Sequence, residues 1–396
     1  NMIWDLTIIG GGPVGSFAGY LAEKNNIKTL ILEEHSQIGE PVHCLGKLSI
    51  HAFEEFPLPK TPILNSLKGG YFFSPEGEVI KLKKNNIDSY ILDRTLFDRL
   101  IAEMAEKEGC VFNFNSKAIG VEQEKGYSSI IVKENEKIRK IDTRVIIDAE
   151  GAKRQFLKKI GMPGKTHLVS LQYEILGVEV PDKECVELYF GKKYSIGFFL
   201  WIAPYGAKIK LGVAVEPLNN PKIFLDRFIE KNLKERASDI KIERSYGGII
   251  PIFGPYEEYI YPNIIVIGDA AGYNKSTTGG GIYFGLQGAS LAITQVKKYL
   301  DSGDFKYLKD YPKQTNKKFG KELKFTKMGR KVLNELSDKD LNSIWRVIKE
   351  NPSIMKAVEE SGDTAYQTSL LRVIPTLISP KSIKLIKLLP KILKAL

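Results

Sequence analysis

The sequence predicts an α/β protein, in which a dinucleotide-binding domain carries an antiparallel β-sheet domain and a helical C-terminal region. Three observations predict this fold class. A glycine-rich turn joins a strand pattern to a helix pattern near the start, short strand patterns crowd 167–216, and helical patterns dominate from 304 onward. The 396 residues are 43% hydrophobic and 27% charged, which is typical of a globular chain of two or three domains.

The glycine-rich turn follows an apolar run that ends at Ile9 and predicts a buried strand. Gly10, Gly12 and Gly15 follow it in GxGxxG spacing. Gly10 permits a tight turn, Gly12 lets a pyrophosphate approach the backbone, and Gly15 lets the next helix pack closely on its strand. The amide N–H groups at the start of that helix then point at phosphate.

A second strand is predicted at Thr29–Leu32, and it ends in Glu33. A carboxylate at this place in a dinucleotide-binding unit can accept hydrogen bonds from ribose hydroxyls, which favours a 2′-hydroxyl over a 2′-phosphate. The strand, glycine turn, helix, second strand and acidic residue follow one another in the order and spacing of a dinucleotide-binding unit. Together they predict a dinucleotide site, although a lone GxGxxG also occurs in ordinary α/β turns.

Residues 36–49 are predicted to form a loop that can lie along the bound dinucleotide. Cys44 in this loop is either a functional thiol or a small buried hydrophobe. Prolines interrupt helix formation between 53 and 90, where 69–82 predicts a hairpin with Gly77 at its turn.

A helix is predicted from a cap at Asp93 or Thr95 to about Lys107, with Gly109 as its stop and Arg94 at its entrance. Its predicted apolar face consists of Leu96, Leu100, Ile101 and Met104. Three strand patterns follow, at 111–122, 128–133 and 138–148, and the last leads into a strand-to-glycine turn at Asp148–Gly151.

The middle of the chain predicts an antiparallel sheet, a helix and one further strand. The strand patterns span 168–180, 186–190, 196–203 and 209–215, the helix 221–235 and the further strand 240–250. The run Phe198–Trp201 is unusually aromatic. It predicts either core packing or the lining of an apolar ligand pocket.

A second glycine-rich stretch follows a buried strand predicted at 264–267. Asp269 stands at the end of this strand, and Gly279, Gly280 and Gly281 open a long apolar helix. The aspartate can accept from polyol hydroxyls, and the glycines offer bare amides to a ring edge or a phosphate. The alternative is a second nucleotide loop, but these glycines lack GxGxxG spacing.

The net charge of +11 is concentrated toward the C-terminus, where no acidic residue follows Asp363. Six basic residues follow it: Arg372, Lys381, Lys384, Lys387, Lys391 and Lys394. They alternate with Ile and Leu, which favours contact with anionic lipid over nucleic acid, and this segment either docks on the protein or forms an interfacial membrane helix. Lysines recurring over 317–331 predict a solvated helix face.

Cysteine usage and hydropathy exclude several classes of protein. Three cysteines without CxxC spacing argue against a disulfide framework or a zinc site, and we expect no bound metal. No apolar run reaches the eighteen residues expected of a transmembrane helix. We therefore expect a cytoplasmic protein with peripheral membrane contact.

Taken in order, five features resemble the geranylgeranyl reductase family of FAD enzymes. They are the dinucleotide loop, the PVxC loop at Pro41–Cys44, Arg94, the strand-to-turn junction at Gly268–Asp269 and the helix start at Gly279–Gly281. The likeness runs from about Ile3 to Leu300. It implies a Rossmann-type FAD-binding domain of the aromatic-hydroxylase-like fold. The implied domains are FAD binding at 1–70, 91–165 and 251–303, substrate binding at 71–90 and 166–250, and a helical region at 304–396.

The resemblance also implies site residues. The ADP moiety would lie on Gly10–Gly15 and Glu33, with backbone contacts from Cys44, Leu45 and Gly46. Arg94 and Ala118 would lie near the adenine and pyrophosphate, and Asp269 at the ribityl or pyrophosphate hydroxyls. The isoalloxazine would meet Gly281 and Ile282, with Gly279 and Gly280 in the same cofactor-binding turn.

The implied activity is saturation of isoprenoid double bonds in membrane ether lipids, with Phe199 and Trp201 at the substrate. Cys44 and His43 are candidate proton donors because their loop should approach the flavin, and a bound water is the alternative. The family's YxWxFPxG signature keeps Trp201 but loses a tyrosine hydroxyl and an aromatic, and Lys47 stands where the family usually has glycine. Alternatives are a monooxygenase or halogenase of the same fold, or a quinone-reducing flavin dehydrogenase. The electron donor could be NAD(P)H, a deazaflavin or a ferredoxin.

Overall fold

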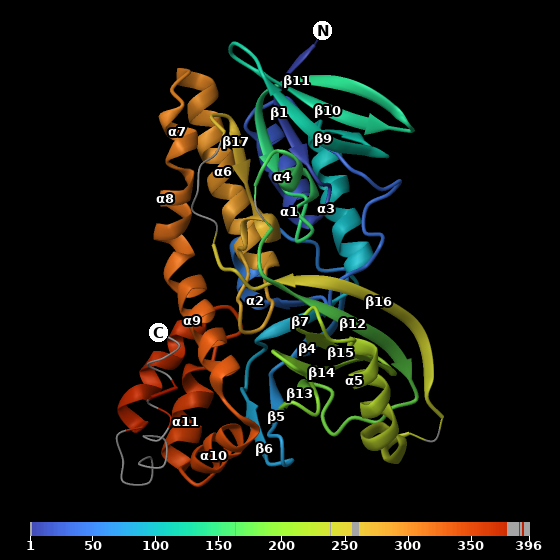
Figure 1. Cartoon of the computed structure of the whole chain (residues 1–396), viewed down its shortest axis with the longest axis vertical. Helices are drawn as coiled ribbons and strands as arrows, with labels where there is room; N and C mark the ends of the chain where they lie inside the picture. The colour runs from blue at the N-terminus through green and yellow to red at the C-terminus, as the bar shows by residue number, and fades with distance from the viewer. Residues whose placement is uncertain are drawn as a thin grey trace.

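The first of three β-sheets forms one end of the molecule (Figure 1). The computed structural model describes residues 2–162, 164–237, 239–255, 261–377, 388, 390 and 391. The first sheet has seven strands: β1 (Ile3–Ile9), β2 (Thr29–Leu32), β8 (Val111–Asn113), β9 (Ser116–Gln123), β10 (Ser128–Glu134), β11 (Lys137–Asp148) and β17 (Ile264–Val266). Their order is β8–β2–β1–β11–β10–β9, and β17 pairs with β11. Strands β1, β2, β11 and β17 run parallel, so their carboxyl ends meet at one edge.

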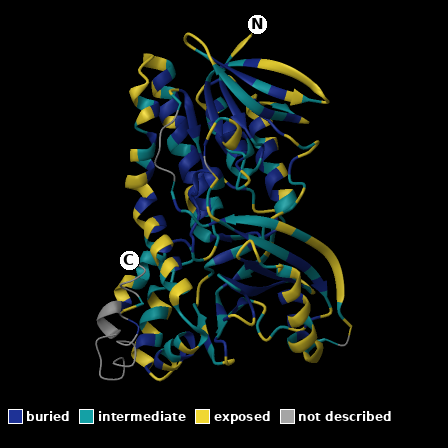
Figure 2. Ribbon diagram, in the orientation of Figure 1, coloured by how far each residue is buried: buried dark blue, intermediate teal, exposed yellow. Residues whose placement is uncertain are grey.

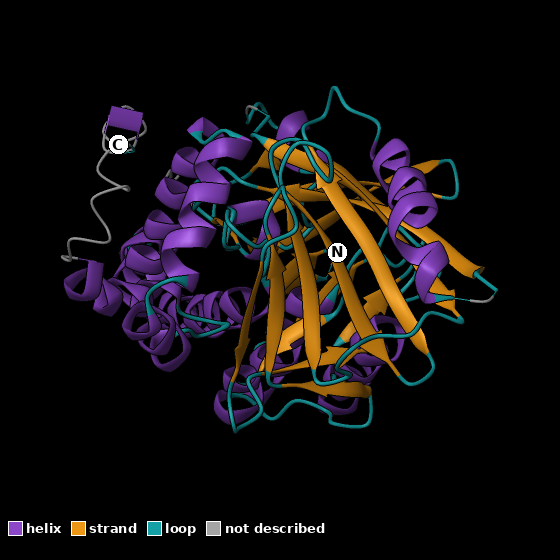
Figure 3. Cartoon of the chain, turned by 90° about the horizontal axis from the view of Figure 1, so that it is seen from below, coloured by secondary structure: helices purple, strands orange, loops and turns teal. Residues whose placement is uncertain are grey.

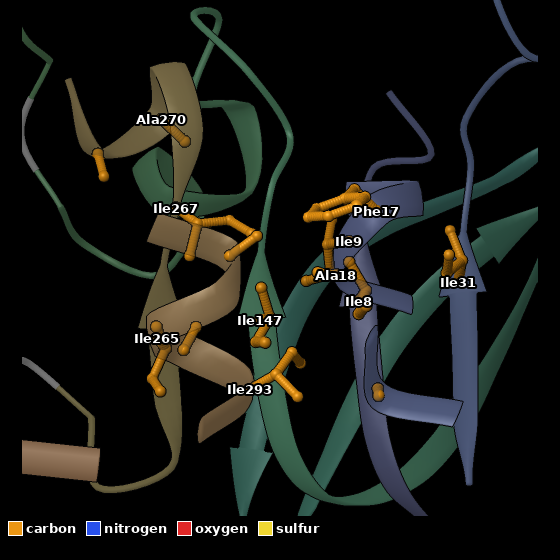
Figure 4. Packing of buried hydrophobic residues seen from close by; sticks show 14 of the residues in the cluster. Ile8, Ile9, Phe17, Ala18, Ile31, Ile147, Ile265, Ile267, Ala270 and Ile293 are labelled. Carbon is orange, nitrogen blue, oxygen red and sulfur yellow. The ribbon is translucent and has the colours of Figure 1, made fainter. Parts of the chain in front are cut away.

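The core of this part is built from β-branched side chains on neighbouring parallel strands. Ile8, Ile31, Ile147 and Ile265 come from β1, β2, β11 and β17 and are almost completely buried (Figure 4). Phe17 packs against them from helix α1 (Pro13–Lys24). Strands covered by helices on their faces need such apolar residues on both sides, which explains the unbroken apolar runs in the sequence.

Helices cover this sheet, and the one predicted from Asp93 or Thr95 to about Lys107 begins and ends where the sequence predicts. The covering helices are α1, α3 (Arg94–Glu108), α4 (Gln155–Lys159) and α6 (Ile282–Ser302). The Asp93 carboxylate caps α3 by accepting from the Leu96 amide at 3.0 Å, and Gly109 ends the helix at a φ of +117°. The predicted apolar face of α3 is wrong in part, because Leu96 is exposed and the buried face contains Phe97, Ile101 and Ala105.

Two further strand predictions need correction. The expected strand at 111–122 is two strands, β8 and β9, because the chain turns at Asn115 with a φ of +51°. The expected loop at 36–49 ends in a short strand, β3 (Lys47–Ser49), which forms a third sheet with β4 (Ile63–Leu67) and β7 (Ser89–Leu92). Helix α2 (Ile50–Glu55) follows β3 directly.

The second large sheet forms the other end of the molecule (Figure 1). In spatial order its strands are β16 (Lys241–Pro251), β12 (His167–Leu176), β15 (Lys208–Val215), β14 (Phe199–Tyr205), β13 (Cys185–Phe190), β5 (Gly69–Phe73) and β6 (Val79–Lys83). The predicted hairpin at 69–82 is confirmed as β5–β6, with Gly77 in its turn at a φ of +93°. Strand β12 ends at Leu176, short of the predicted 180, and β14 begins at Phe199 instead of 196.

Helix α5 (Pro221–Phe228) packs on this sheet and continues through a π-helical turn, Ile229–Leu233, and a 3₁₀ turn, Lys234–Arg236. The helix predicted at 221–235 is therefore confirmed, with an irregular second half. Viewed along the long axis, the strands fill the centre and the C-terminal helices gather along one flank (Figure 3).

The C-terminal region is helical, as predicted. It comprises α7 (Lys306–Lys309), α8 (Tyr311–Thr315), a π turn (Asn316–Gly320), α9 (Lys321–Glu335), α10 (Asp338–Lys349), α11 (Pro352–Ser361) and a 3₁₀ helix (Gln367–Leu377). The lysines of 317–331 are exposed on the outer face, where Figure 2 shows a yellow ridge. Among the described residues, no helix combines the length and apolar character needed to cross a bilayer.

The basic segment at the C-terminus lies largely outside the described residues. Lys381, Lys384, Lys387 and Lys394 belong to that part. Within the described part, Leu388 is buried and the Lys391 ammonium contacts the Asp340 carboxylate on α10. Membrane docking of this segment stays a prediction.

Candidate functional site

A cavity of about 470 Å³ opens at the carboxyl ends of the parallel strands of the first sheet. Its walls include Gly10–Val14 after β1, Glu33 after β2, Ala149–Gly151 after β11, and Gly268 with Asp269 after β17. Ligands of open parallel sheets bind outside the carboxyl ends of the strands. The topology therefore brings both predicted glycine-rich stretches, some 250 residues apart, to one site.

Three glycines shape the phosphate end of this cavity. A Cβ on Gly10 would lie 2.5 Å from the Ala149 carbonyl oxygen, and one on Gly15 would lie 2.0 Å from the Gly10 oxygen. A Cβ on Gly12 would meet no protein atom within 4 Å, because this residue faces the open cavity. Helix α1 begins here without a side-chain cap, so its first amides are free for an anion, and the residues present fit a pyrophosphate.

Glu33, which follows β2, lines the cavity next to the glycine turn, and its carboxylate is held by several contacts. It accepts from the Gly11 amide at 2.8 Å and from the His35 amide at 2.9 Å, and it lies 2.6 Å from His35 Nδ1. Ala118 on β9 lines the same end of the cavity. The predicted ribose acceptor, Glu33, thus lines the cavity, and the backbone amides of Gly11 and His35 hold its carboxylate in place.

The PVxC loop forms another part of the wall, with a division of roles that the sequence did not reveal. His43 and Cys44 line the cavity, whereas Leu45 and Gly46 lie behind it. Lys210, buried on β15, donates to the Leu45 carbonyl at 2.9 Å. Gly46 has a φ of +84°, and a Cβ there would lie 2.6 Å from the Leu92 carbonyl oxygen.

Arg94 stands at the junction of this loop with α3. Its guanidinium donates through Nε and Nη2 to both Asp98 carboxylate oxygens, each at 2.9 Å. Burial opposes the charge on Arg94, but the carboxylate of Asp98 and the nearby thiol of Cys44 outweigh it and raise the Arg94 pKa. The arginine therefore stays charged beside the cavity, where its ion pair with Asp98 holds the guanidinium in place.

Asp269 and the start of α6 line a further part of the cavity. A Cβ on Gly281 would lie 2.6 Å from Asp269 Oδ1, so a larger residue at 281 would displace this carboxylate. Gly281 and Ile282 line the cavity, whereas Gly279 and Gly280 form the turn behind them. Burial raises the pKa of Asp269 to about 6, although Arg94 acts in the opposite direction.

This pKa predicts a pH-dependent cofactor affinity. We expect FAD binding to tighten between pH 5 and pH 7.5, because Asp269 becomes a carboxylate that accepts from hydroxyls as the pH rises through about 6. The variant Asp269→Asn should bind about tenfold more weakly at pH 7.5, equivalent to about 1.4 kcal/mol, and should lose this pH dependence. Equilibrium titration of apoprotein with FAD measures both, and an unchanged pH profile in the variant would contradict the assignment.

The aromatic stretch around Trp201 lies in a buried cluster beside the cavity. Phe199 and Trp201 are each less than a tenth exposed, and the Trp201 indole donates to Gln172 Oε1 at 2.9 Å. A Cβ on Gly212 would lie 2.3 Å from that indole, so the glycine makes room for it. The cavity described above does not include either aromatic residue, and their role at the substrate stays a prediction.

The wall also includes residues that were not predicted as site residues. Gly247 and Gly248 on β16 line the cavity, and the Gly247 carbonyl lies 2.8 Å from His43 Nδ1. The turn at Glu150–Gly151 was visible as a strand-to-glycine pattern, but such turns are too common to be distinctive. Within the described ranges, no three His, Cys, Asp or Glu side chains gather closely enough to hold a metal ion.

Comparison with known proteins shows which proteins share this arrangement. Residues 5–152 match a family of FAD-dependent oxidoreductases, and 167–249 match the catalytic domain of geranylgeranyl reductases. A digeranylgeranylglycerophospholipid reductase of Methanocaldococcus jannaschii is 33% identical over 362 residues, covering 89% of this chain and 92% of the relative.

Solved structures agree with the sequence relatives. A geranylgeranyl bacteriochlorophyll reductase-like protein of Thermoplasma acidophilum superposes with a TM-score of 0.84 at 25% identity, covering 98% of this chain and 99% of the other. A p-nitrophenol 4-monooxygenase of Pseudomonas putida reaches a TM-score of 0.69 at 14% identity, covering 90% and 97%, and shows the shared fold alone.

Proposed function

Because the chain belongs to the geranylgeranyl reductase family of FAD-dependent oxidoreductases, we propose that it saturates double bonds in the isoprenoid chains of membrane ether lipids. One observation carries the proposal. The segment 167–249, which matches the catalytic-domain family, supplies β12 to β16, and β16 contributes Gly247 and Gly248 to the cavity wall beside His43. The second sheet therefore covers the end of the FAD site that the PVxC loop forms.

The protein's own residues bind and orient the reactants. When bound and reduced by its electron donor, FAD would supply the hydride that one alkene carbon receives. The glycine turn and Glu33 would hold the ADP part, and Asp269 with Gly281 would hold the ribityl and ring parts. An isoprenoid chain would pack against the buried apolar cluster that contains Phe199 and Trp201 on β14, and this cluster would exclude water and orient the chain.

The second alkene carbon needs a proton, for which we propose the thiol of Cys44. This thiol lines the cavity, is partly exposed to it, and lies 3.3 Å from the Gly46 amide, which donates to it. Hydride and proton together add two hydrogen atoms across one double bond. Arg94, which lies beside Cys44, would stabilise the thiolate left behind.

Two partners belong to the proposal. The enzyme would take electrons from NAD(P)H, a deazaflavin or a ferredoxin. The sequence carries one dinucleotide fingerprint, which FAD would occupy, so no second fingerprint selects among these donors. It would act in the cytoplasm with its basic C-terminal segment on the membrane surface, where an ether lipid presents its chains.

The activity is tested by incubating purified enzyme and dithionite with an unsaturated isoprenoid lipid. We expect a mass gain of about two units per double bond. The variant Cys44→Ala should lower the rate at least tenfold while keeping its bound FAD, as a proton donor typically contributes a factor of about 10² or more. No mass gain with wild-type enzyme would contradict the proposal, and quinone reduction or oxygen-dependent NAD(P)H consumption in its place would support the alternatives.

A further inference from the structure

Lys275 is a buried cation directly behind the Gly279–Gly281 turn. Its side chain is 5% exposed, and its ammonium donates to the Thr364 carbonyl. A Cβ on Gly280 would lie 3.2 Å from Lys275 Cε and 3.7 Å from Nζ. The Lys275 carbonyl accepts from the Gly279 amide at 2.7 Å, and its amide donates to the Gly280 carbonyl at 3.0 Å. Backbone and side chain together tie this lysine to the turn.

A C-terminal strap, defined here as residues 363–368, covers Lys275 from outside. Asp363 Oδ2 lies 3.0 Å from His51 Nε2 on α2, and Lys47 on β3 donates to Thr364 Oγ1 at 3.1 Å. The Gln367 and Thr368 amides donate to the Glu322 carboxylate on α9 at 2.6 and 3.0 Å. Tyr366 reaches the first turn of α6, where its hydroxyl lies 3.1 Å from that of Tyr283. These contacts fix the strap at four places, and its Thr364 carbonyl accepts from the Lys275 ammonium.

The charges that face Lys275 come from four separate elements. They are Lys47 on β3, Asp88 in the turn before β7, Glu322 on α9 and Asp363 on the strap. Burial and the nearby charge of Lys47 lower the pKa of Lys275 to about 8, although the three carboxylates act in the opposite direction. Lys275 therefore keeps its charge at pH 7 and loses it as the pH rises above about 8.

The three carboxylates are engaged elsewhere. Asp88 pairs with Lys84 at 3.0 Å, Asp363 lies beside His51, and Glu322 accepts from two backbone amides. In the described part of the chain, the hydrogen-bond acceptor of the Lys275 ammonium is a carbonyl. Its positive charge is thus not cancelled by a direct ion pair, and in a buried environment it acts over several ångströms.

We propose that Lys275 is a positioning residue for the redox chemistry, whose charge behind the Gly279–Gly281 turn raises the reduction potential of the bound FAD. This rests on the proposed function, which places the ring of FAD at Gly281 and Ile282. Uptake of two electrons and one proton adds one net negative charge to the ring system. A nearby cation stabilises that charge, and charge close to the ring is one of the means by which a protein tunes a flavin.

The test measures the potential of the FAD-loaded enzyme at pH 7 by titration with dithionite against a reference dye. The variants are Lys275→Met, which removes the charge at similar length, and Lys275→Arg, which keeps it. Lys331→Met on the exposed face of α9 is the control. At the potential where wild-type FAD is half reduced, Lys275→Met should show an oxidised-to-reduced ratio at least tenfold higher, equivalent to about 30 mV. The other two variants should stay within twofold of wild type.

The pH dependence separates charge from structure. As the pH rises from 7 to 9.5, the reduction potential of wild type should approach that of Lys275→Met, because Lys275 loses its charge. The potential of Lys275→Arg should stay above that of Lys275→Met, because arginine remains protonated. If Lys275→Met fails to fold, wild type and Lys275→Arg should still diverge above pH 8, and their coincidence over this range would overturn the inference. FAD bound to Lys275→Met with an unshifted ratio would overturn the inference alone. Failure of wild type to retain FAD would overturn the proposed function as well.

Discussion

Replacement of Gly12 by valine is expected to weaken FAD binding at least a hundredfold while leaving the apoprotein folded. The loss corresponds to about 2.7 kcal/mol. No protein atom lies within 4 Å of a Cβ at this position, and its backbone is extended, with φ of −64° and ψ of 179°, so the chain itself tolerates a side chain. The valine would instead occupy the space through which the pyrophosphate reaches the amides of α1.

The matched control for this variant is Gly15→Val. Here the Cβ would lie 2.0 Å from the Gly10 carbonyl oxygen, so the helix must move off its strand and the apoprotein should lose stability. Urea unfolding of the apoproteins and FAD titration of the folded ones separate the two effects. An unchanged FAD affinity in Gly12→Val would contradict the placement of the pyrophosphate.

The second large effect is expected from Arg94→Met, which should lower the free energy of unfolding by about 3–5 kcal/mol. The substitution leaves Asp98 buried, at 7% exposure, without the guanidinium that pairs with both of its oxygens. Burial raises the pKa of Asp98, and loss of Arg94 removes the main effect opposing that rise. A carboxyl with a raised pKa in the folded state costs stability as the pH increases, so the loss should be larger at pH 8 than at pH 5.

The double variant Arg94→Met with Asp98→Leu is the control for this prediction. It removes both charges, and replacement of a buried ion pair by apolar residues is often nearly neutral, so much of the lost stability should return. Urea denaturation of the apoproteins at both pH values measures these differences. A loss below about 1 kcal/mol in the single variant would show that solvent screens Asp98.

Much of the first domain could be predicted because its signals lie in consecutive residues. The apolar run before Gly10, the GxGxxG spacing and Glu33 each reflect a local requirement, and the structure brings them to one cavity wall. The same holds for Asp269 and Gly281, which follow a buried strand and open a helix. Family membership, FAD and the α/β class are confirmed, while the domain boundaries and the individual site roles stay predictions.

Predictions were weaker where several neighbours compete for one position. The apolar face of α3 is shifted by one residue, because contact with the sheet selects Phe97 over Leu96. The family resemblance implies backbone contacts with the cofactor from Cys44, Leu45 and Gly46, but of these three only Cys44 lines the cavity. Lys210 holds the next carbonyl from another sheet, 165 residues away, and no local pattern indicates such a contact.

The sequence by itself determined the strand–turn–helix units, the glycines of the FAD site and the family, since steric demands and periodicity act between close neighbours. Only the tertiary structure decided how β16 meets the PVxC loop and how the C-terminal strap encloses Lys275. Thr364 lies 89 residues beyond Lys275 and 317 beyond Lys47. Contacts over such separations depend on how sheets and helices pack as whole units. The burial of Lys275 could not be predicted from the sequence, because that packing is what excludes solvent from its side chain.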